Sequence, residues 1–515
     1  MKGPRYSSVV LTSRSMSGLL SRERIIAPPG FNRWLVPPAA LAIHLSIGMA
    51  YGFSVFWLPL SRAIGITQST PEDWKISTLA WMYTLFFVML GSSAALFGPW
   101  VEREGPRKAG AAAACCWGGG FLISAIGIHL HQVWMLWVGS GIIGGCGLGL
   151  GYISPVSTLI KWFPDRRGMA TGLAIMGFGG GAMIGSPLAD VLMRRFSTPA
   201  SVGVWQTFVV LGILYFAAMM AGAFGYRLPP PEWIPKGWTP PPAVSRAGVT
   251  TSAVPVDVAW RTRQFWLLWA VLCLNVSAGI GILGMASPMI QEVFRGRVSA
   301  SAAAGFAGLL SLFNIGGRIF WASLSDRIGR KATYGIFFAL GMVLYASVPI
   351  AGSSGNLALF VTIFCVVLTM YGGGFATIPA YLADLFGVHF VSAIHGRLLT
   401  AWSTAGILGP VLVNYIREYQ IGRGVAASDA YTFTMYVLVG MLGIGFICNM
   451  AVRPVPERLF VHVTGDRTKT AELRSPGSQT PTRQWGLATS AWALAAIPLG
   501  WGVFRTLTLA SQMFR

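Results

Sequence analysis

The segment ASLSDRIGRK (residues 322–331) follows a long apolar run and places one acid and three basic residues within ten positions. A second segment, GPWVEREGPRK (residues 98–108), has a similar pattern and also follows an apolar run. We call the sequence separation from Glu102 to Asp326 the repeat offset, and the same separation also aligns Pro155 with Pro379. Because two independent landmarks share one offset, the chain is predicted to consist of two similar halves in tandem.

Apolar runs of about 20 residues recur along nearly the whole chain, and each is long enough to cross roughly 30 Å of hydrocarbon. The chain has 515 residues, of which 54% are hydrophobic and 11% are charged, whereas soluble domains have about 25% charged residues. Backbone groups in lipid must bond to one another, so runs of this length indicate helices. The sequence therefore predicts an all-α polytopic membrane protein.

Twelve membrane spans are expected, six in each half. They cover residues 34–60, 76–100, 108–130, 132–161, 168–193, 203–226, 264–293, 301–325, 331–351, 356–386, 392–416 and 430–452. We assign the two six-helix bundles to residues 34–226 and 264–453. The connector between them, residues 227–263, contains RLPPPEWIPKGWTPPPA, which is too rich in proline for a helix and suits an extended linker.

Polar tails flank the two bundles. Residues 1–33 are basic and lack an apolar core followed by a cleavage site, so they are expected to form a cytoplasmic tail. Residues 454–483 form a second polar tail. The apolar segment QWGLATSAWALAAIPLGWGVF (residues 484–504) follows and is closed by Arg505. We assign residues 484–505 to one further helix, which is long enough to span the membrane. This segment has two interpretations: it is a thirteenth membrane span, or it is a helix that lies along the membrane.

The net charge of +21 comes from basic residues at helix ends and in the tails. This distribution favours the lipid bilayer over nucleic acid as a partner. With the N-terminus in the cytoplasm, the inner loops hold fifteen basic residues and the outer loops hold eight, as the positive-inside rule requires. We therefore expect a multi-pass protein of the inner (plasma) membrane. The six cysteines lie in apolar runs without metal-site spacing, so no metal and no cofactor is predicted.

The two charged loops resemble the paired G-x-x-x-D-R-x-G-R-K loops of the major facilitator superfamily. The second copy matches at Asp326, Arg327, Gly329, Arg330 and Lys331, with Ala322 in place of the first glycine. The first copy keeps Gly98, Arg103, Gly105 and Arg107, with Glu102 in place of the aspartate. The resemblance implies a fold of two six-helix bundles, and it implies that these loop residues are conformational latches and not substrate ligands.

Three further stretches are similar to the oxalate/formate antiporter family within that superfamily. They are LIKWFPDRRGMATGLAIMGFGGGAMIG (residues 159–185), YGGGFATIPAYLADLFG (residues 371–387) and HGRLLTAWSTAGILGP (residues 395–410). The similarity covers most of residues 34–453 and implies transport of small organic anions by alternating access. The segment 484–504 resembles a short single-helix companion of this family.

Arg318 is a cation inside the apolar run from Ala302 to Leu324. It lies eight residues before Asp326, hence about 12 Å deeper at 1.5 Å per residue, which is close to the midplane of the hydrocarbon. The acids nearest to membrane depth fall at helix ends: Asp190, Asp384 and Glu292. A guanidinium matches a carboxylate with two parallel hydrogen bonds. Arg318 is therefore predicted to bind an anionic substrate, a structural ion pair being the alternative, and the resemblance implies the same substrate role.

Further residues are expected to line the same pocket, with simple packing as the alternative for each. They are His44 and Tyr51 on one face of the first helix, Tyr152 late in the fourth, Asn314 one turn before Arg318, Tyr371 and Phe375 in the tenth, and Trp402 in the eleventh. By the resemblance, Trp402 replaces a lysine of the family's oxalate transporter. A single buried cation favours a monocarboxylate over a dianion. The glycine clusters GGCGLGLG (residues 144–151) and GFGGGAMIG (residues 177–185) are expected to let helices approach closely.

The predicted function is secondary active transport of a small organic anion, either a monocarboxylate or an oxalate/formate-like acid. Exchange for a second anion and symport with a proton both remain open. Two rivals are a multidrug or cation exporter of the same fold, which usually needs a buried acid, and a membrane sensor that binds without transport. No enzyme activity is expected, because no nucleophile–base pair or metal cluster is found.

Overall fold

The computed structural model describes residues 18–163, 167–230, 233–235, 252–387, 390–462 and 482–514. Within these ranges, thirteen helices are long and apolar enough to cross a membrane by length and composition. The predicted all-α fold class is confirmed. The strands of the described part are two residues long, β1 (Ser252–Ala253) and β2 (Val461–His462), and they pair antiparallel beside the linker.

The first half contains six membrane helices, two of which are built from several pieces. They are η2–α1–η3–α2 (Arg33–Leu35, Val36–Ile47, Gly48–Phe56, Trp57–Leu60), α3 (Ile76–Glu104), α4 (Pro106–His129), α5–η4–α6 (Val133–Leu136, Trp137–Gly144, Gly145–Trp162), α7 (Arg167–Phe196) and α8 (Val204–Gly225). A short helix, η1 (Glu23–Ile25), precedes them.

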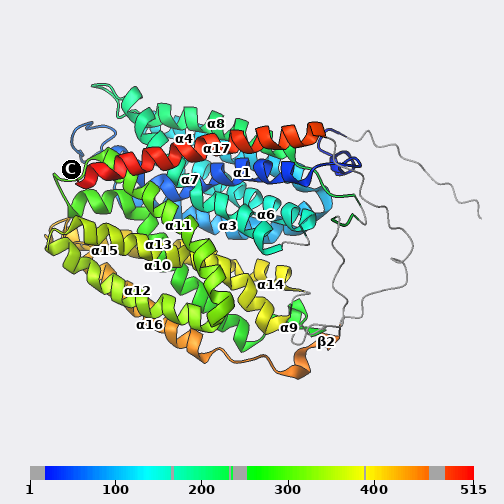
Figure 1. Ribbon diagram of the computed structural model, residues 1–515. Helices are drawn as coiled ribbons and strands as arrows, with labels where there is room; N and C mark the ends of the chain where they lie inside the picture. The colour runs from blue at the N-terminus through cyan, green and yellow to red at the C-terminus, as the bar shows by residue number, and fades with distance from the viewer. Residues whose placement is uncertain are drawn as a thin grey trace, which may run out of the picture.

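The second half repeats this order after α9 (Val256–Ala259). It contains α10 (Arg263–Val293), α11 (Ala300–Ile328), α12 (Arg330–Ser353), α13 (Leu357–Phe386), α14–α15 (Val391–Leu398, Thr400–Gly422) and α16 (Thr432–Ala451). Then come η5 (Glu457–Leu459), α17 (Thr482–Ser511) and η6 (Gln512–Phe514). Figure 1 shows the helices lying side by side. We call the end of the bundle that carries residues 226–230 and 252–262 the linker end, and the opposite end the far end.

The helices reproduce the repeat offset that the sequence indicates. Helix α3 begins at Ile76 and α11 begins one repeat offset later, at Ala300, and both are 29 residues long. Helices α4 and α12, each of 24 residues, begin at Pro106 and Arg330 with the same offset. The glycines between them, Gly105 and Gly329, have φ of 92° and 87°. Side chains other than glycine rarely adopt this backbone conformation, which explains why the motif has glycine there.

Basic residues of the two loop motifs hold helix ends together. Arg107 donates to the carbonyl oxygens of Phe224 (3.3 Å) and Tyr226 (3.2 Å) at the end of α8. Lys331, one repeat offset after Arg107, donates to the carbonyl oxygens of Met450 and Val452 (both 2.8 Å) at the end of α16. A cation is favourable at a helix C-terminus because the last carbonyl groups carry partial negative charge.

The remaining motif residues have different environments. Arg330 forms ion pairs with Asp326 and with Asp384 (Nε to Oδ2, 3.4 Å), so it joins the linker ends of α11, α12 and α13. Arg103 and Arg327 are exposed, and Gly98 is partly buried. The side chain of Glu102 lies outside the described residues. A latch role for these loops remains a prediction.

Close backbone packing shapes the first membrane helix. Its central part, η3, is a 3₁₀-helix of nine residues, which is long for this conformation. A Cβ added at Gly48 would overlap the carbonyl oxygen of Phe178, and one added at Gly181 would overlap the backbone of Gly48. The backbones of η3 and α7 are therefore in direct contact, as expected for the glycine cluster at 177–185. This contact brings Tyr51 next to Phe178.

The two halves meet along α3 and α15 and along α7 and α11. At the far end, Glu418 Oε1 accepts a hydrogen bond from the backbone N–H of Ser77 (3.0 Å) in the first turn of α3. In the other seam, Ser301 Oγ in the first turn of α11 donates to Asp190 Oδ2 (2.7 Å). Ser77 and Ser301 are equivalent in the repeat, being separated by the repeat offset. Each half thus uses the same helical turn to bind a carboxylate of the other half.

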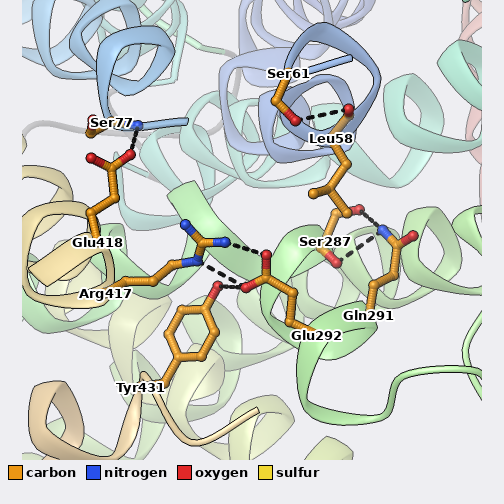
Figure 2. Close-up of polar contacts among 9 residues, drawn as sticks. All are labelled: Leu58, Ser61, Ser77, Ser287, Gln291, Glu292, Arg417, Glu418 and Tyr431. Carbon is orange, nitrogen blue, oxygen red and sulfur yellow. Dashed lines mark hydrogen bonds and ion pairs between the residues drawn. The ribbon is translucent and has the colours of Figure 1, made fainter. Parts of the chain in front are cut away.

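A buried ion pair positions this contact in the second half. Arg417 binds Glu292 through two hydrogen bonds, one of them from Nε to Oε2 (2.9 Å), and Tyr431 also donates to Oε2 (2.6 Å). Figure 2 shows Glu418, the next residue along α15, turned toward Ser77. The side chains of Arg417 and Glu292 are 9% and 13% exposed. The pair therefore fixes α15 to α10 next to the residue that reaches the first half.

Helix α17 packs against both halves. Thr506 Oγ1 donates to the carbonyl oxygen of Met183 in α7 (2.9 Å), and Thr506 also packs on Gly308 of α11. Nearer the linker end, Trp492 Nε1 donates to the carbonyl oxygen of Trp34 (3.0 Å). In Figure 1, α17 runs along the bundle to the far end, where the C-terminus lies. The helix thus lies along the seam between α7 and α11.

We expect α17 to cross the membrane, because it is long, apolar and parallel to the other spans. The measurement is labelling of single cysteines with an impermeant maleimide in a background without the six native cysteines. Ser511→Cys should react from the same side as Ser353→Cys at the far end, and from the side opposite to Glu457→Cys at the linker end. Labelling of Ser511→Cys from the same side as Glu457→Cys would mean that α17 lies along the membrane.

Removing the acid of the buried ion pair should destabilise the protein. Glu292→Gln leaves Arg417 buried without its carboxylate, which typically costs about 3–5 kcal/mol. The expected result is a clear fall in the thermal unfolding temperature, partly recovered in the double variant Glu292→Gln/Arg417→Gln. The matched control is Glu104→Gln, which breaks the exposed pair with Lys108 and should change little. Equal effects of Glu292→Gln and Glu104→Gln would show that burial of the pair is unimportant.

Candidate substrate-binding site

Arg318 lies within α11 and reaches the other half of the molecule. Its Nε donates to Asn314 Oδ1 one turn earlier (3.0 Å), and its Nη1 donates to the carbonyl oxygen of Ile175 in α7 (3.2 Å). The third nitrogen, Nη2, is buried and has no hydrogen-bond partner among the described residues. Only 4% of the residue is exposed. A buried cation with one free donor is therefore placed where the two halves meet.

The acids that lie nearest to membrane depth in the sequence are engaged at the helix ends. Asp190 binds Ser301 and Arg194, Asp384 binds Arg330, and Glu292 binds Arg417. Among the ion pairs between described residues, none includes Arg318. An uncompensated charge inside a membrane protein is costly and usually faces a ligand or a water-filled path. This arrangement fits a binding site for an anion, and a structural ion pair of Arg318 is not found between the described residues.

Two further buried donors at the site lack partners within the described part of the chain. They are Nδ2 of Asn314 and Nε1 of Trp402, in residues that are 0% and 1% exposed. Buried polar groups in proteins are nearly always hydrogen-bonded, so unpaired ones call for an explanation. Together with Nη2 of Arg318 they form a set of donors. Such a set complements a carboxylate, which only accepts hydrogen bonds.

Aromatic rings enclose these donors. The Phe375 ring lies 5.8 Å from the guanidinium carbon of Arg318, a distance at which a cation is attracted to the face of a ring. Trp402 packs on Phe375 with 4.4 Å between ring centroids, on Tyr152 with 5.4 Å and on Phe178 with 5.7 Å. The buried donors are therefore surrounded by aromatic side chains that pack on one another.

Tyrosine hydroxyls link the halves next to the guanidinium. The hydroxyls of Tyr51 in η3 and Tyr371 in α13 are hydrogen-bonded to each other (3.0 Å). Both hydroxyls, and that of Tyr152, interact electrostatically with Arg318. His44 contacts the same group of residues, since its Nε2 lies 3.1 Å from the carbonyl oxygen of Tyr152. The structure thus places all eight predicted pocket residues in one connected cluster, none of them more than 4% exposed.

Three contributions to the site were missed by the sequence analysis. Phe178 packs on both Tyr51 (4.9 Å) and Trp402, and the carbonyl oxygen of Ile175 binds the guanidinium. At Gly179 an added Cβ would lie 3.1 Å from Arg318 Nε, so this glycine leaves room for the guanidinium. Phe178 precedes Trp402 by the repeat offset. This relationship could have identified Phe178 as the counterpart of Trp402, a predicted site residue.

The two halves contribute unequally to the chemistry. The repeat position of Arg318 in the first half is Ala94, which carries no charge. Within the described part of the chain, groups of three or more His, Cys, Asp or Glu that could hold a metal ion are absent. The guanidinium of Arg318 is therefore present in one half and has no charged counterpart at the equivalent position of the other half.

Comparison with known proteins agrees with this architecture. The family model of the Major Facilitator Superfamily matches residues 39–410. The oxalate:formate antiporter of Oxalobacter formigenes is 26% identical over 383 residues, covering 73% of this chain and 83% of that protein. This agrees with the predicted resemblance to oxalate/formate antiporters. Human monocarboxylate transporter 11 is 24% identical over 402 residues, covering 76% of this chain and 78% of that protein.

A solved structure with a similar fold is that of a bacterial homologue of the human lysosomal transporter Spinster. It superposes with a TM-score of 0.61 at 14% identity, covering 83% of this chain and 97% of that one. The protein is thus a multi-pass membrane protein, and the prediction that it is not an enzyme is confirmed by its transporter relatives. The chain belongs to the Major Facilitator Superfamily.

Proposed function

We propose that the protein is a secondary active transporter that carries small organic anions, monocarboxylate or oxalate/formate-like, across the inner membrane by alternating access. The observation that carries this proposal is Arg318. Its guanidinium is buried, has a free donor, and has no carboxylate partner among the described residues. The oxalate:formate antiporter and monocarboxylate transporter among the similar proteins support this class of substrate.

Binding follows from the donors at the site. A carboxylate placed against Arg318 neutralises the buried charge, and its oxygens satisfy Nη2 of Arg318 and Nδ2 of Asn314. The aromatic rings of Phe375, Trp402 and Tyr152 exclude water, which strengthens the attraction between the two charges. The anion thereby removes the cost of leaving these groups unpaired.

Movement follows from the position of the site between the halves. Nη1 of Arg318 binds the Ile175 carbonyl of the first half, so a carboxylate that competes for the guanidinium weakens a contact that joins the halves. Opening toward the far end requires the Ser77–Glu418 and Ser301–Asp190 contacts to break. Opening toward the linker end, which we assign to the cytoplasm, would involve the loops around Asp326 and Arg330 as latches.

A cation exporter is a poorer match for this site. Such a protein needs a buried acid, and the eight clustered site residues include a buried arginine and no acid. Because these eight residues include no acid, the charge of the transported anion can be balanced in two ways. The protein exchanges the anion for a second anion, or a proton enters together with it, carried by the substrate or by His44. Uptake into proteoliposomes separates a transporter from a sensor, and counterflow against a pH gradient separates the two coupling modes.

Arg318→Gln should abolish transport. Loss of two hydrogen bonds from a charged group, each typically about 1.5–3 kcal/mol, predicts a fall of roughly 100-fold or more in the initial rate at low substrate. The measurement is uptake of labelled formate, acetate, lactate, glyoxylate and oxalate into proteoliposomes. Arg318→Lys keeps the charge without the planar fork and should retain part of the activity.

The matched control is Arg423→Gln, which removes an exposed arginine at the far end and should transport normally. Thermal unfolding of each variant checks that it is folded. A folded Arg318→Gln protein that transports these anions at the wild-type rate would overturn the proposed function.

A further inference from the structure

Helix α17 has no role in the transport cycle described so far, although it lies along the seam between the halves. Between described residues, the hydrogen bonds that join α17 to the rest of the chain all have their partners in the first half. They begin in the first turn of α17 and continue to its last turns. The helix is therefore attached to the first half along its length. The bonds run from the Asn32 N–H to Gln484 (2.5 Å), from Trp492 to the Trp34 carbonyl (3.0 Å) and from Thr506 to the Met183 carbonyl (2.9 Å).

The contact of α17 with the second half is close packing against α11. A Cβ added at Gly305 would overlap the backbone of Ala510, and one added at Gly308 would overlap the hydroxyl of Thr506. At both glycines the three nearest atoms all belong to α17. Small residues let membrane helices approach in this way, and the resulting van der Waals contacts hold the helices together. Both glycines lie in the first three turns of α11, which begins at Ala300, so α17 packs on the far-end part of α11.

This arrangement makes the two directions of opening unequal. The first turns of α11 are held by Asp190 of α7, which accepts a hydrogen bond from Ser301, and by the packing of α17 on Gly305 and Gly308. Separation of α11 from the first half at the far end would break both contacts. Separation at the linker end would leave them close to the pivot and largely intact. Because each lost packing contact removes attraction between the helices, α17 adds to the cost of opening at the far end.

We propose that α17 is a clamp: it moves with the first half, holds the far-end part of α11, and favours the state that is closed at the far end. The clamp adds to the contact between Ser301 and Asp190 and uses none of the residues that bind Arg318. It makes the far-end-closed state the resting state of the protein without substrate. The inference rests on the proposed function for alternating access, and its first test requires no transport.

The first test measures opening at the far end by electron–electron double resonance on the full chain in lipid, without substrate. Spin labels are attached to Ser197→Cys and Ser353→Cys, exposed sites at the far ends of α7 and α12, in a background without the six native cysteines. Gly305→Leu forces α17 away from α11 and should raise the ratio of long to short distances about tenfold, which corresponds to roughly 1.4 kcal/mol. The matched control is Gly500→Leu, because a Cβ added at Gly500 of α17 meets no atom within 4 Å. That control should leave the distances unchanged.

The second test determines with which half α17 moves. A Cβ added at Gly308 would lie 3.3 Å from the Cβ of Thr506, close to the separation of about 3.5–4.5 Å in a disulfide. The disulfide between Gly308→Cys and Thr506→Cys ties α11 to α17 and should abolish uptake of labelled acetate until it is reduced. The matched control is the disulfide between Ile184→Cys and Gly502→Cys, which ties α17 to α7 of the same half. That control should transport at the wild-type rate in both redox states.

The outcomes separate the clamp from the proposed function. Unchanged distances in a folded Gly305→Leu protein, or full transport with α11 and α17 cross-linked, would make the clamp wrong and leave the proposed function standing. An equal shift in Gly500→Leu would show a general effect of an added leucine and also overturn the clamp. If Gly305→Leu does not fold, the pair of disulfides decides. Wild-type transport in folded Arg318→Gln, together with the expected shift in Gly305→Leu, would overturn the proposed function and keep the clamp.

Discussion

The buried charge of Arg318 is the constraint on which the central site depends. A guanidinium inside a membrane protein is costly unless other groups satisfy it, and here the protein satisfies it only in part, with the Asn314 side chain and one backbone carbonyl of the opposite half. Helices α7 and α11 must approach closely for that carbonyl to reach, which is why Gly179 lies against the guanidinium. In the proposed function, the donor of Arg318 that has no partner among the described residues binds the anion. Binding of the anion then weakens the contact between the guanidinium and the opposite half.

The tandem repeat supplies a nearly symmetric scaffold for an asymmetric site. Repeat-related residues perform the same structural task where the task is mechanical: Arg107 and Lys331 each hold the end of a helix, and Ser77 and Ser301 each bind a carboxylate across a seam. At the centre the equivalent residues differ. Phe178 and Trp402 are both rings but only one has a donor, and Arg318 has Ala94 as its counterpart. In the proposed function, a nearly symmetric frame rocks about a site in which one half holds the charge of the ligand and the other supplies part of the wall.

Much of the fold followed from the sequence because its causes are local. The apolar runs predict the helices, and the two loop motifs indicate the tandem repeat. Helices α3 and α11 start one repeat offset apart, and so do α4 and α12. Arg318 was identifiable because its depth and the positions of the acids can be counted along the chain. The Ile175 carbonyl was not, since backbone groups leave no mark in a sequence, and Phe178 looked like any packing residue. The pairing of Ser77 with Glu418 joins residues 341 positions apart and has no local pattern. The packing of α17 against both halves likewise depends on tertiary contacts.

The most direct measurement of the central claim is the contact between the substrate carboxylate and the Arg318 guanidinium. Solid-state NMR on the protein in lipid, with ¹⁵N-labelled arginine and a monocarboxylate carrying ¹³C at its carboxyl carbon, reports dipolar coupling between the two groups. The account predicts strong coupling to one guanidinium, with N–O separations of about 2.7–2.9 Å typical of charge-assisted hydrogen bonds, and loss of that signal in Arg318→Gln. Bound substrate that shows no coupling to any guanidinium, or that keeps its coupling in Arg318→Gln, would contradict the account.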